Sequence, residues 1–147
     1  MRNLIPQQDG GDNGSPDSKH QRTALVVDDC SDIRLLLTRQ LLALGYNVLS
    51  AADGAEAREL ARTVSAADGN GIDLLITDRS MPRLTGDELV RWFRQEKPET
   101  QIIIMSTDGD GLPDHAAFLQ KPFTLTSLHD VLSETSQCAD FLKQTAS

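Results

Sequence analysis

Three short, nearly uninterrupted apolar runs in this chain each stop at a polar side chain, and this pattern limits the possible fold more than any other feature. The runs and the polar residues after them are 24–27 before Asp28 and Asp29, 72–77 before Asp78, and 102–105 before Ser106. Such runs are typical of strands buried on both faces, as in parallel sheets. Ligands bind such sheets at the carboxyl ends of the strands. The sequence therefore predicts a polar site at that edge.

The segments between these runs have the spacing of amphipathic helices. Apolar residues recur at helical spacing from Ile33 to Leu44, with Ser31 or Asp32 as the expected N-cap and Gly45 as the helix end. Further helices are expected at 54–64, 87–95 and 125–142, and further strands at 46–51 and 117–120. Strands that alternate with helices in this way predict an α/β protein with a parallel sheet of five strands.

Several large apolar side chains lie on the expected helices. The six leucines between Leu35 and Leu44, counting both ends, are assigned to the core. Trp92 and Phe93 are neighbours on the third helix, so one of them must be partly exposed. The exposed ring is either a contact for a partner or an ordinary surface aromatic.

The chain is expected to hold one domain. Residues 1–22 are rich in Gly, Gln, Asp, Asn and Ser, which favours a flexible tail. The domain is expected at 23–138, and residues 139–147 are expected to form the end of the last helix and a C-terminal tail. Since no effector module is expected after the last helix, the protein is expected to act through another protein.

Composition excludes several classes of function. The net charge of −8 opposes nucleic-acid binding, because acidic side chains repel phosphates. No apolar run reaches the roughly 18 residues that a membrane span needs, and the polar N-terminus does not resemble a signal peptide. The two cysteines, Cys30 and Cys138, match no metal-binding spacing and are expected to be reduced thiols. A cytoplasmic protein is therefore expected.

Carboxylates that converge at one sheet edge repel each other unless a cation neutralises them. Mg²⁺ suits this task because it prefers oxygen ligands and commonly binds one or two carboxylates together with phosphate oxygens. A carboxylate beside Mg²⁺ can attack phosphorus and form an acyl phosphate. Lys121 and Ser106 could then stabilise the negative charge of the phosphoryl group during its transfer.

Four segments carry a resemblance to a known family. They are LVVDD ending at Asp29, LLITDRSMPRLTG from Leu74 to Gly86, IIIMS ending at Ser106, and FLQKPF from Phe118 to Phe123. In this order and spacing, the chain from about Thr23 to about Gln137 resembles the receiver domain of two-component response regulators, of the single-domain chemotaxis-regulator type. The resemblance implies a flavodoxin-like, doubly wound sheet of five parallel strands.

The resemblance also implies a role for each matching residue. Asp78 matches the phosphoacceptor. Mg²⁺ would be held by Asp29, by Asp78 and by the backbone carbonyl of Ser80, with Asp28 assisting through water. Ser106 matches the switch hydroxyl, Lys121 the lysine that pairs with the phosphoryl oxygens, and Phe118 the aromatic switch residue. The peptide bond between Lys121 and Pro122 matches one that is cis in the family.

The chain departs from the family between Ser106 and Lys121. Residues 107–116 contain Gly109, Gly111 and Pro113, which favour turns and disfavour a helix. The family normally has its fourth helix here, so we expect that helix to be missing or reduced to about one turn. A shortened segment of this kind resembles receivers attached to, or encoded with, sensor kinases.

The leading interpretation is a stand-alone receiver that accepts a phosphoryl group on Asp78 from a sensor histidine kinase or a histidine phosphotransfer protein. It would then bind an unknown downstream protein or pass the group onward. One alternative is a Mg²⁺-dependent phosphohydrolase with an Asp nucleophile. Such enzymes usually carry an acid two residues after the nucleophile, where this chain has Ser80. Another alternative is a degenerate receiver that serves only as an interaction module.

Overall fold

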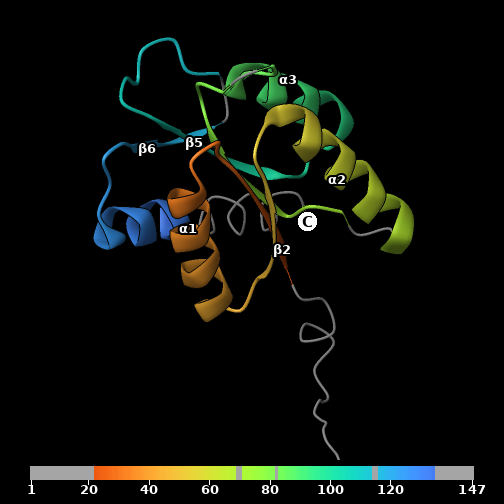
Figure 1. Ribbon diagram of the computed structural model, residues 1–147, viewed down its shortest axis with the longest axis horizontal. Coiled ribbons are helices and arrows are strands. Elements are labelled where there is room, and N and C mark those ends of the chain that lie inside the picture. Colours follow the sequence, from red (N-terminus) through yellow and green to blue (C-terminus); the bar gives the residue numbers. More distant parts are fainter. Residues whose placement is uncertain (1–21, 69–70, 82, 114–115, 135–147) are drawn as a thin grey trace, which may run out of the picture.

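The computed structural model describes residues 22–68, 71–81, 83–113 and 116–134 (Figure 1). The elements in chain order are β2 (Thr23–Val27), α1 (Ser31–Ala43), β3 (Asn47–Ala51), α2 (Gly54–Asp68), β4 (Leu74–Asp78), α3 (Gly86–Glu96), β5 (Gln101–Ser106) and β6 (Ala117–Gln120). Residues 125–134 are also helical. The expectations for residues 1–21 and 135–147 lie outside the described residues.

The five strands form one parallel sheet in the order β3-β2-β4-β5-β6. From β2 the chain first adds β3 on one side, and then crosses back to add β4, β5 and β6 on the other. The strand order therefore reverses between β2 and β4, which is where doubly wound sheets bind ligands. The predicted flavodoxin-like α/β fold is confirmed.

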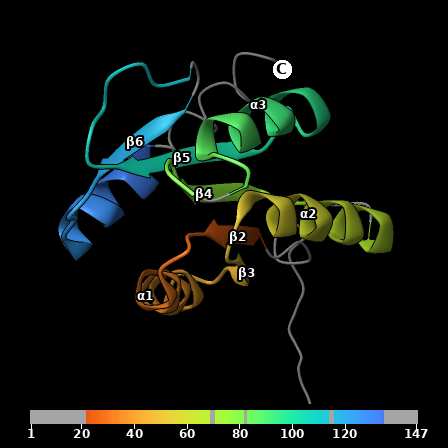
Figure 2. The same ribbon diagram turned by 45° about the horizontal axis from the view of Figure 1, so that its top comes forward.

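Helices cover both faces of the sheet (Figure 2). Consecutive strand residues point to opposite faces. Leu25 and Val27 pack in one core cluster with residues of α2 and α3, whereas Ala24 and Val26 pack in the other cluster with α1 and residues 125–134. This burial on both faces explains why the strands read as continuous apolar runs. Among the described residues, no helix has the length and apolar character required to cross a membrane.

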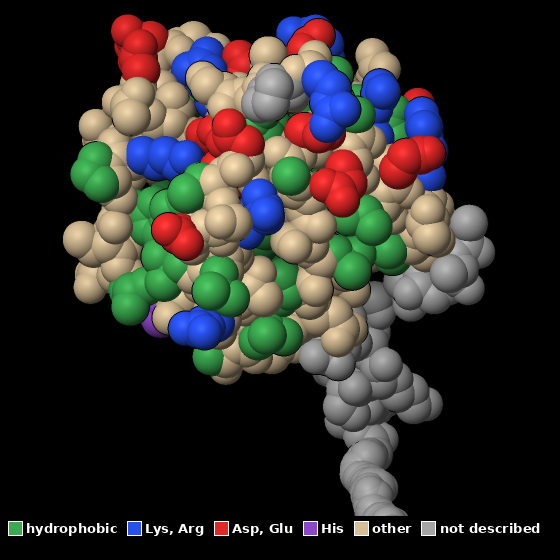
Figure 3. Space-filling model, viewed as in Figure 1, with side chains coloured by type: hydrophobic (Ala, Val, Ile, Leu, Met, Phe, Trp, Pro, Cys, Tyr) green, Lys and Arg blue, Asp and Glu red, His purple; other side chains and the backbone are tan. Residues whose placement is uncertain are grey.

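The assignment of all six leucines of 35–44 to the core was wrong. Leu37 and Leu41 are fully buried, but Leu42 is 55% exposed. The other exposed leucines are Leu35, Leu36 and Leu44. A helix on one face of a sheet buries a single stripe, and this run of leucines extends around the helix beyond that stripe. Apolar side chains accordingly gather over α1 in the space-filling view (Figure 3).

The start of α1 also differs from the expectation. Neither Ser31 nor Asp32 is the N-cap, since both lie inside the helix and Cys30 holds the cap position without a side-chain cap bond. The backbone N–H of Cys30 instead donates to Asp28 Oδ1 at 2.9 Å. An acid of the predicted site therefore helps to fix the turn from β2 into α1.

The segment between β5 and β6 forms no helix in its described residues, 107–113 and 116. A turn at Asp110 and Gly111 takes the place of the helix, and Gly111 adopts the left-handed conformation with φ of 64°. Glycine tolerates this conformation because it lacks a Cβ atom. The predicted loss or shortening of the fourth helix is confirmed.

Leu37 and Leu42 provide a test of the burial pattern within a single helix. We expect Leu37→Ala to lower the free energy of unfolding by about 2–5 kcal/mol, because it leaves a cavity between α1 and the sheet. Leu42→Ala removes the same atoms from an exposed position and should cost about 0.5 kcal/mol. Urea unfolding followed by circular dichroism measures both values, and equal losses would contradict the burial pattern.

Candidate functional site

The polar residues predicted to converge do lie at the carboxyl edge of the sheet. Asp28 and Asp29 follow β2 directly, while Asp78 and Ser106 are the last residues of β4 and β5. Lys121 follows β6. Because β2, β4, β5 and β6 are consecutive parallel strands in the sheet, these ends face the same side of the molecule.

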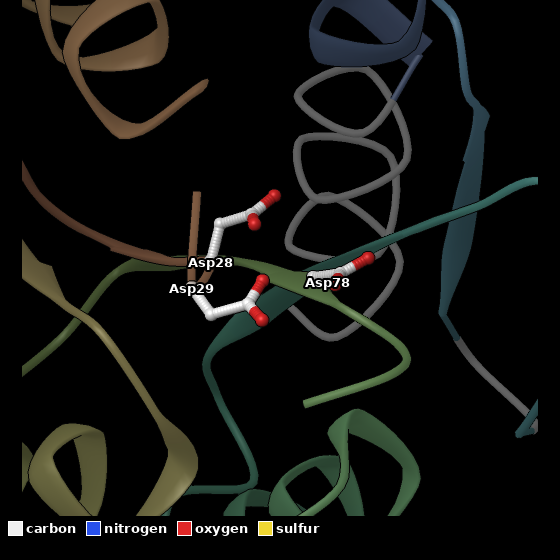
Figure 4. Close-up of side chains that lie close together, drawn as sticks. All are labelled: Asp28, Asp29 and Asp78. Carbon is white, nitrogen blue, oxygen red and sulfur yellow. The ribbon is translucent and has the colours of Figure 1, made fainter. Parts of the chain in front are cut away.

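Three carboxylates form an acidic cluster beside the point where the strand order reverses (Figure 4). One oxygen from each of Asp28, Asp29 and Asp78 lies within 4.8 Å of the others. Asp28 is fully buried, Asp78 is nearly so, and Asp29 is exposed. Hard oxygen donors at this spacing fit Mg²⁺, which needs few protein ligands and keeps several of its waters.

Lys121 bridges the two buried acids. Its Nζ lies 2.9 Å from Asp28 Oδ2 and 3.1 Å from Asp78 Oδ1. Burial alone would lower the pKa of Lys121, but hydrogen bonds to Asp28 and Asp78 raise the pKa above its ordinary value. Lys121 therefore stays charged and partly neutralises the acidic cluster.

The two oxygens of Asp28 already have partners. Oδ2 accepts from Lys121 Nζ, and Oδ1 accepts from the N–H of Cys30. The Asp29 carboxylate is exposed to solvent. Asp29 is therefore better placed than Asp28 for direct contact with a cation.

Burial raises the pKa of Asp78, although its hydrogen bond to Lys121 opposes this shift. The charges of Asp28 and Asp29 raise the pKa further. The negative charge of Asp78 is thus held in an unfavourable environment. A cation bound at the acidic cluster would lower the electrostatic cost of this charge.

Ser106 ends β5, the strand next to β4, and Phe118 lies on β6, the strand after that, level with Ile104. Ser106 Oγ accepts a hydrogen bond from the N–H of Asp108 at 3.1 Å. Phe118 is half-buried on β6, and its ring lies against Gly109, where a Cβ atom would come within 3.2 Å of it. Both residues therefore contact the segment that replaces the fourth helix.

The remaining expectations concern two backbone features. Ser80 lies in a bend two residues after Asp78, with an exposed side chain, and the role of its carbonyl stays a prediction. The bond between Lys121 and Pro122 is cis, as expected. The N–H of Lys121 donates to the carbonyl of Ser106, which aligns the residue beside the acidic cluster.

Sequence reasoning missed two arginines at this edge. Arg34 Nη1 donates to the carbonyl of Asp28 at 2.6 Å from the first turns of α1. Arg79 contacts Asp87 and the segment after Ser106. The position of Arg79 directly after Asp78 was the only signal in the sequence, and it gave no indication of these partners.

Comparison with known proteins identifies the family. The model of the response regulator receiver domain matches residues 24–133. The chain belongs to the response regulator receiver domain family. Receiver domains are signalling modules of two-component systems, and they interact with histidine kinases and phosphotransfer proteins.

Relatives of this receiver occur both as separate proteins and as parts of larger ones. The chemotaxis protein CheY homolog of Campylobacter jejuni is 34% identical over 120 residues, which is 75% of this chain and 88% of the relative. The sensor kinase CckA of Brucella abortus is 32% identical over 125 residues, 80% of this chain but only 13% of the kinase. The chain spans a similarly small part of the sensor kinases CqsS and EvgS, at 16% and 10%.

Solved structures agree with the family assignment. The response regulator TrrA of Thermotoga maritima, in complex with Mg²⁺-BeF, is 28% identical and has a TM-score of 0.65. The match covers 78% of this chain and 98% of TrrA. Receiver domains typically bind Mg²⁺ at an acidic pocket, and this receiver has a cluster of three acids.

Mg²⁺ should stabilise this receiver through the acidic cluster. At about ten times its dissociation constant, a ligand that binds only the folded state stabilises it by about 1.4 kcal/mol. We expect Mg²⁺ to raise the melting temperature of the parent protein and to leave that of Asp29→Asn nearly unchanged. The control is Asp32→Asn, which removes an exposed acid in the first turn of α1 and should keep the full response. Equal responses of both variants would contradict the assignment.

Lys121 should stabilise the fold through its charge. Lys121→Ala leaves two buried carboxylates without their counter-ion, and we expect it to lower the free energy of unfolding by about 2–3 kcal/mol. This value lies below the range for fully buried pairs because the Lys121 side chain is 22% exposed. Mg²⁺ should restore part of the loss, since it supplies positive charge to the same carboxylates. Chemical unfolding of Lys121→Ala and Lys121→Arg, with and without Mg²⁺, tests this, and a loss as large in the Arg variant would argue against a role of charge.

Proposed function

We propose that this receiver accepts a phosphoryl group on Asp78 from a phosphohistidine of a partner protein, in a reaction that requires Mg²⁺. The observation that supports this most directly is the position of the Asp78 carboxylate between two other acids and the Nζ of Lys121. That arrangement provides a nucleophile, a set of oxygen ligands for a cation and a fixed positive charge at one place. The complex of TrrA with Mg²⁺-BeF supports the same choice of metal.

The transfer exchanges one bond to phosphorus for another. An oxygen of Asp78 attacks the phosphorus, and an O–P bond forms as the N–P bond of the phosphohistidine breaks. The imidazole nitrogen keeps the electron pair of the broken bond and takes a proton from solvent. The product is an acyl phosphate on Asp78, which water can later hydrolyse.

Each residue of the site has a defined part in this proposal. Asp29, Asp78 and the carbonyl of Ser80 would hold Mg²⁺, and Asp28 would act through water because Lys121 and Cys30 already engage both of its oxygens. When bound, Mg²⁺ neutralises the charge that develops on the phosphoryl oxygens. Lys121 donates to one of those oxygens from its position beside Asp78.

The signal would then pass through the switch residues. A phosphoryl group at Asp78 offers acceptor oxygens to the hydroxyl of Ser106, at the end of the next strand in the sheet. Phe118 lies beside Ile104 on the neighbouring strand and contacts Gly109, so it can respond to movement of the segment after Ser106. Phosphorylation would thus shift the population between two conformations of this edge.

The partner that supplies the phosphoryl group is a sensor histidine kinase or a histidine phosphotransfer protein in the cytoplasm. The relatives support this, because several of them are sensor kinases that contain a matching segment. The recipient of the signal is a further protein, bound as an effector or phosphorylated in a relay. The acidic net charge of −8 opposes a direct role on nucleic acid.

A small phosphodonor tests the proposal without the kinase. Incubation with Mg²⁺ and acetyl phosphate should add one phosphoryl group to the parent protein, as measured by intact mass, and chelation of Mg²⁺ should prevent this addition. Asp78→Asn should accept none, because it replaces the nucleophilic carboxylate with a neutral amide. Asp32→Asn, an exposed acid outside the cluster, should behave as the parent does.

The other outcomes separate the alternatives. A parent protein that accepts no phosphoryl group would indicate a degenerate receiver. An adduct that persists in Asp78→Asn would place the acceptor elsewhere. Repeated turnover of small phosphoesters, with release of phosphate far beyond one equivalent, would indicate a phosphohydrolase.

A further inference from the structure

The guanidinium of Arg79 binds the backbone of the segment that replaces the fourth helix. Nη1 donates to the carbonyl oxygens of Asp110 at 2.6 Å and of Asp108 at 3.2 Å, and Nη2 donates to that of Gly111 at 2.9 Å. We call Arg79 and these three carbonyl groups the carbonyl clasp. Carbonyl groups that a helix would pair internally are satisfied here by one side chain.

Arg79 itself is fixed from the opposite side. The carboxylate of Asp87, in the first turn of α3, accepts from Nε at 3.1 Å and from Nη2 at 3.2 Å. This two-point contact orients the plane of the guanidinium. The backbone of Arg79 is equally constrained, since its N–H donates to Met105 and its carbonyl accepts from Gly86. The Nη1 and Nη2 donors of Arg79 therefore face residues 108–111 already in the unphosphorylated protein.

The segment is also attached to the site through Ser106. The N–H of Asp108 donates to Ser106 Oγ, and the N–H of Asp110 donates to Asp108 Oδ1 at 2.9 Å. Gly109 lies between these two residues and against the ring of Phe118. Residues 108–111 are thus attached at two points near Asp78, to the side chain of Arg79, the next residue in the chain, and to the hydroxyl of Ser106 on the neighbouring strand.

We propose that Arg79 is a positioning residue that holds residues 108–111 as one rigid unit and couples this unit to phosphorylation of Asp78. The coupling rests on the function proposed above. A phosphoryl group adds roughly −1.5 to −2 charges at Asp78 and attracts the Ser106 hydroxyl, which is the acceptor for Asp108. Because the clasp joins Asp108 to Asp110 and Gly111, all three residues respond together. Without Arg79, Asp110 is joined to Asp108 only by its N–H bond to Asp108 Oδ1, so less of the movement of Ser106 reaches Asp110 and Gly111.

The clasp is tested first in the unmodified protein. In Arg79→Gln we expect the amide protons of Asp108 and Asp110 to exchange at least about tenfold faster, because the loss of charged hydrogen bonds frees the segment to open. Arg79→Lys keeps the charge but not the fork of donors, and it should also exchange faster than the parent. Residue-resolved hydrogen exchange by NMR measures these rates.

Arg83→Gln is the matched control. Arg83 lies in the same connection between β4 and α3, carries the same charge and pairs with Asp53 at the start of α2. Its substitution should leave the exchange of Asp108 and Asp110 unchanged. Parent-like exchange in Arg79→Gln, or equally fast exchange in Arg83→Gln, would overturn the clasp.

The coupling is tested with acetyl phosphate and Mg²⁺, after intact mass has established that each protein carries one phosphoryl group. In the parent and in Arg83→Gln, phosphorylation should shift the amide signals of Ser106, Asp110 and Gly111. In Arg79→Gln the Ser106 shift should persist, and the Asp110 and Gly111 shifts should fall to less than about half, since the segment is no longer held as one unit. A purely structural role of Arg79 predicts no such separation.

Two results would overturn the coupling, and they are distinguishable. If phosphorylation of Arg79→Gln shifts the amide signals of Asp110 and Gly111 as much as in the parent, Arg79 does not couple these residues to Asp78. A parent protein that accepts no phosphoryl group would overturn the proposed function and the coupling together, while the exchange rates of the unmodified proteins would still decide whether the clasp exists. If Arg79→Gln does not fold, Asp87→Asn replaces it, because it releases the guanidinium and should give the same changes to a smaller extent.

Discussion

The whole carboxyl edge of the sheet depends on the ion pairs of Lys121 with Asp28 and Asp78, because the ammonium group offsets the negative charge of these two carboxylates. Two carboxylates that are almost completely buried would repel each other across neighbouring strands without the ammonium group between them. The same contact ties the residue after the edge strand β6 to the centre of the sheet. It also engages one oxygen of Asp28, whereas the exposed carboxylate of Asp29 has no such contact with Lys121. The same ion pairs of Lys121 therefore stabilise the fold and shape the acidic cluster.

The strands of the sheet and the convergence of the site residues at its edge could be predicted from the sequence, for a physical reason. Strands buried on both faces must be apolar throughout, so the run before Asp78 identified β4 without knowledge of its neighbours. Once the strands are parallel, residues that directly follow them lie at one edge, whatever the details of the helices. The convergence of Asp28, Asp78 and Lys121 follows from that geometry, and the glycines of 107–116 indicated that a helix was absent.

What could not be predicted depends on how segments pack. Helical spacing alone does not distinguish Leu37 from Leu42, because a run of leucines that extends around the helix contains several possible stripes and the sheet selects one. The partners of Arg79 were also hidden. They lie 29–32 positions along the chain and are backbone carbonyls, which leave no trace in the identity of the residues. Contacts of this kind follow from the path of a loop, which sequence patterns do not specify.

The carbonyl clasp has a consequence for how such a receiver can diversify. Arg79 binds a backbone oxygen of Asp110, an atom that every amino acid carries, so this contact places little demand on the side chain at position 110. The side chains of Asp108 and Asp110 are exposed. A helix at this position would have to keep an apolar stripe against the sheet, whereas a segment held by its backbone can vary its outward chemistry and keep its shape. In this receiver the outward side chain at position 110 can thus change without loss of the bond that Arg79 makes there.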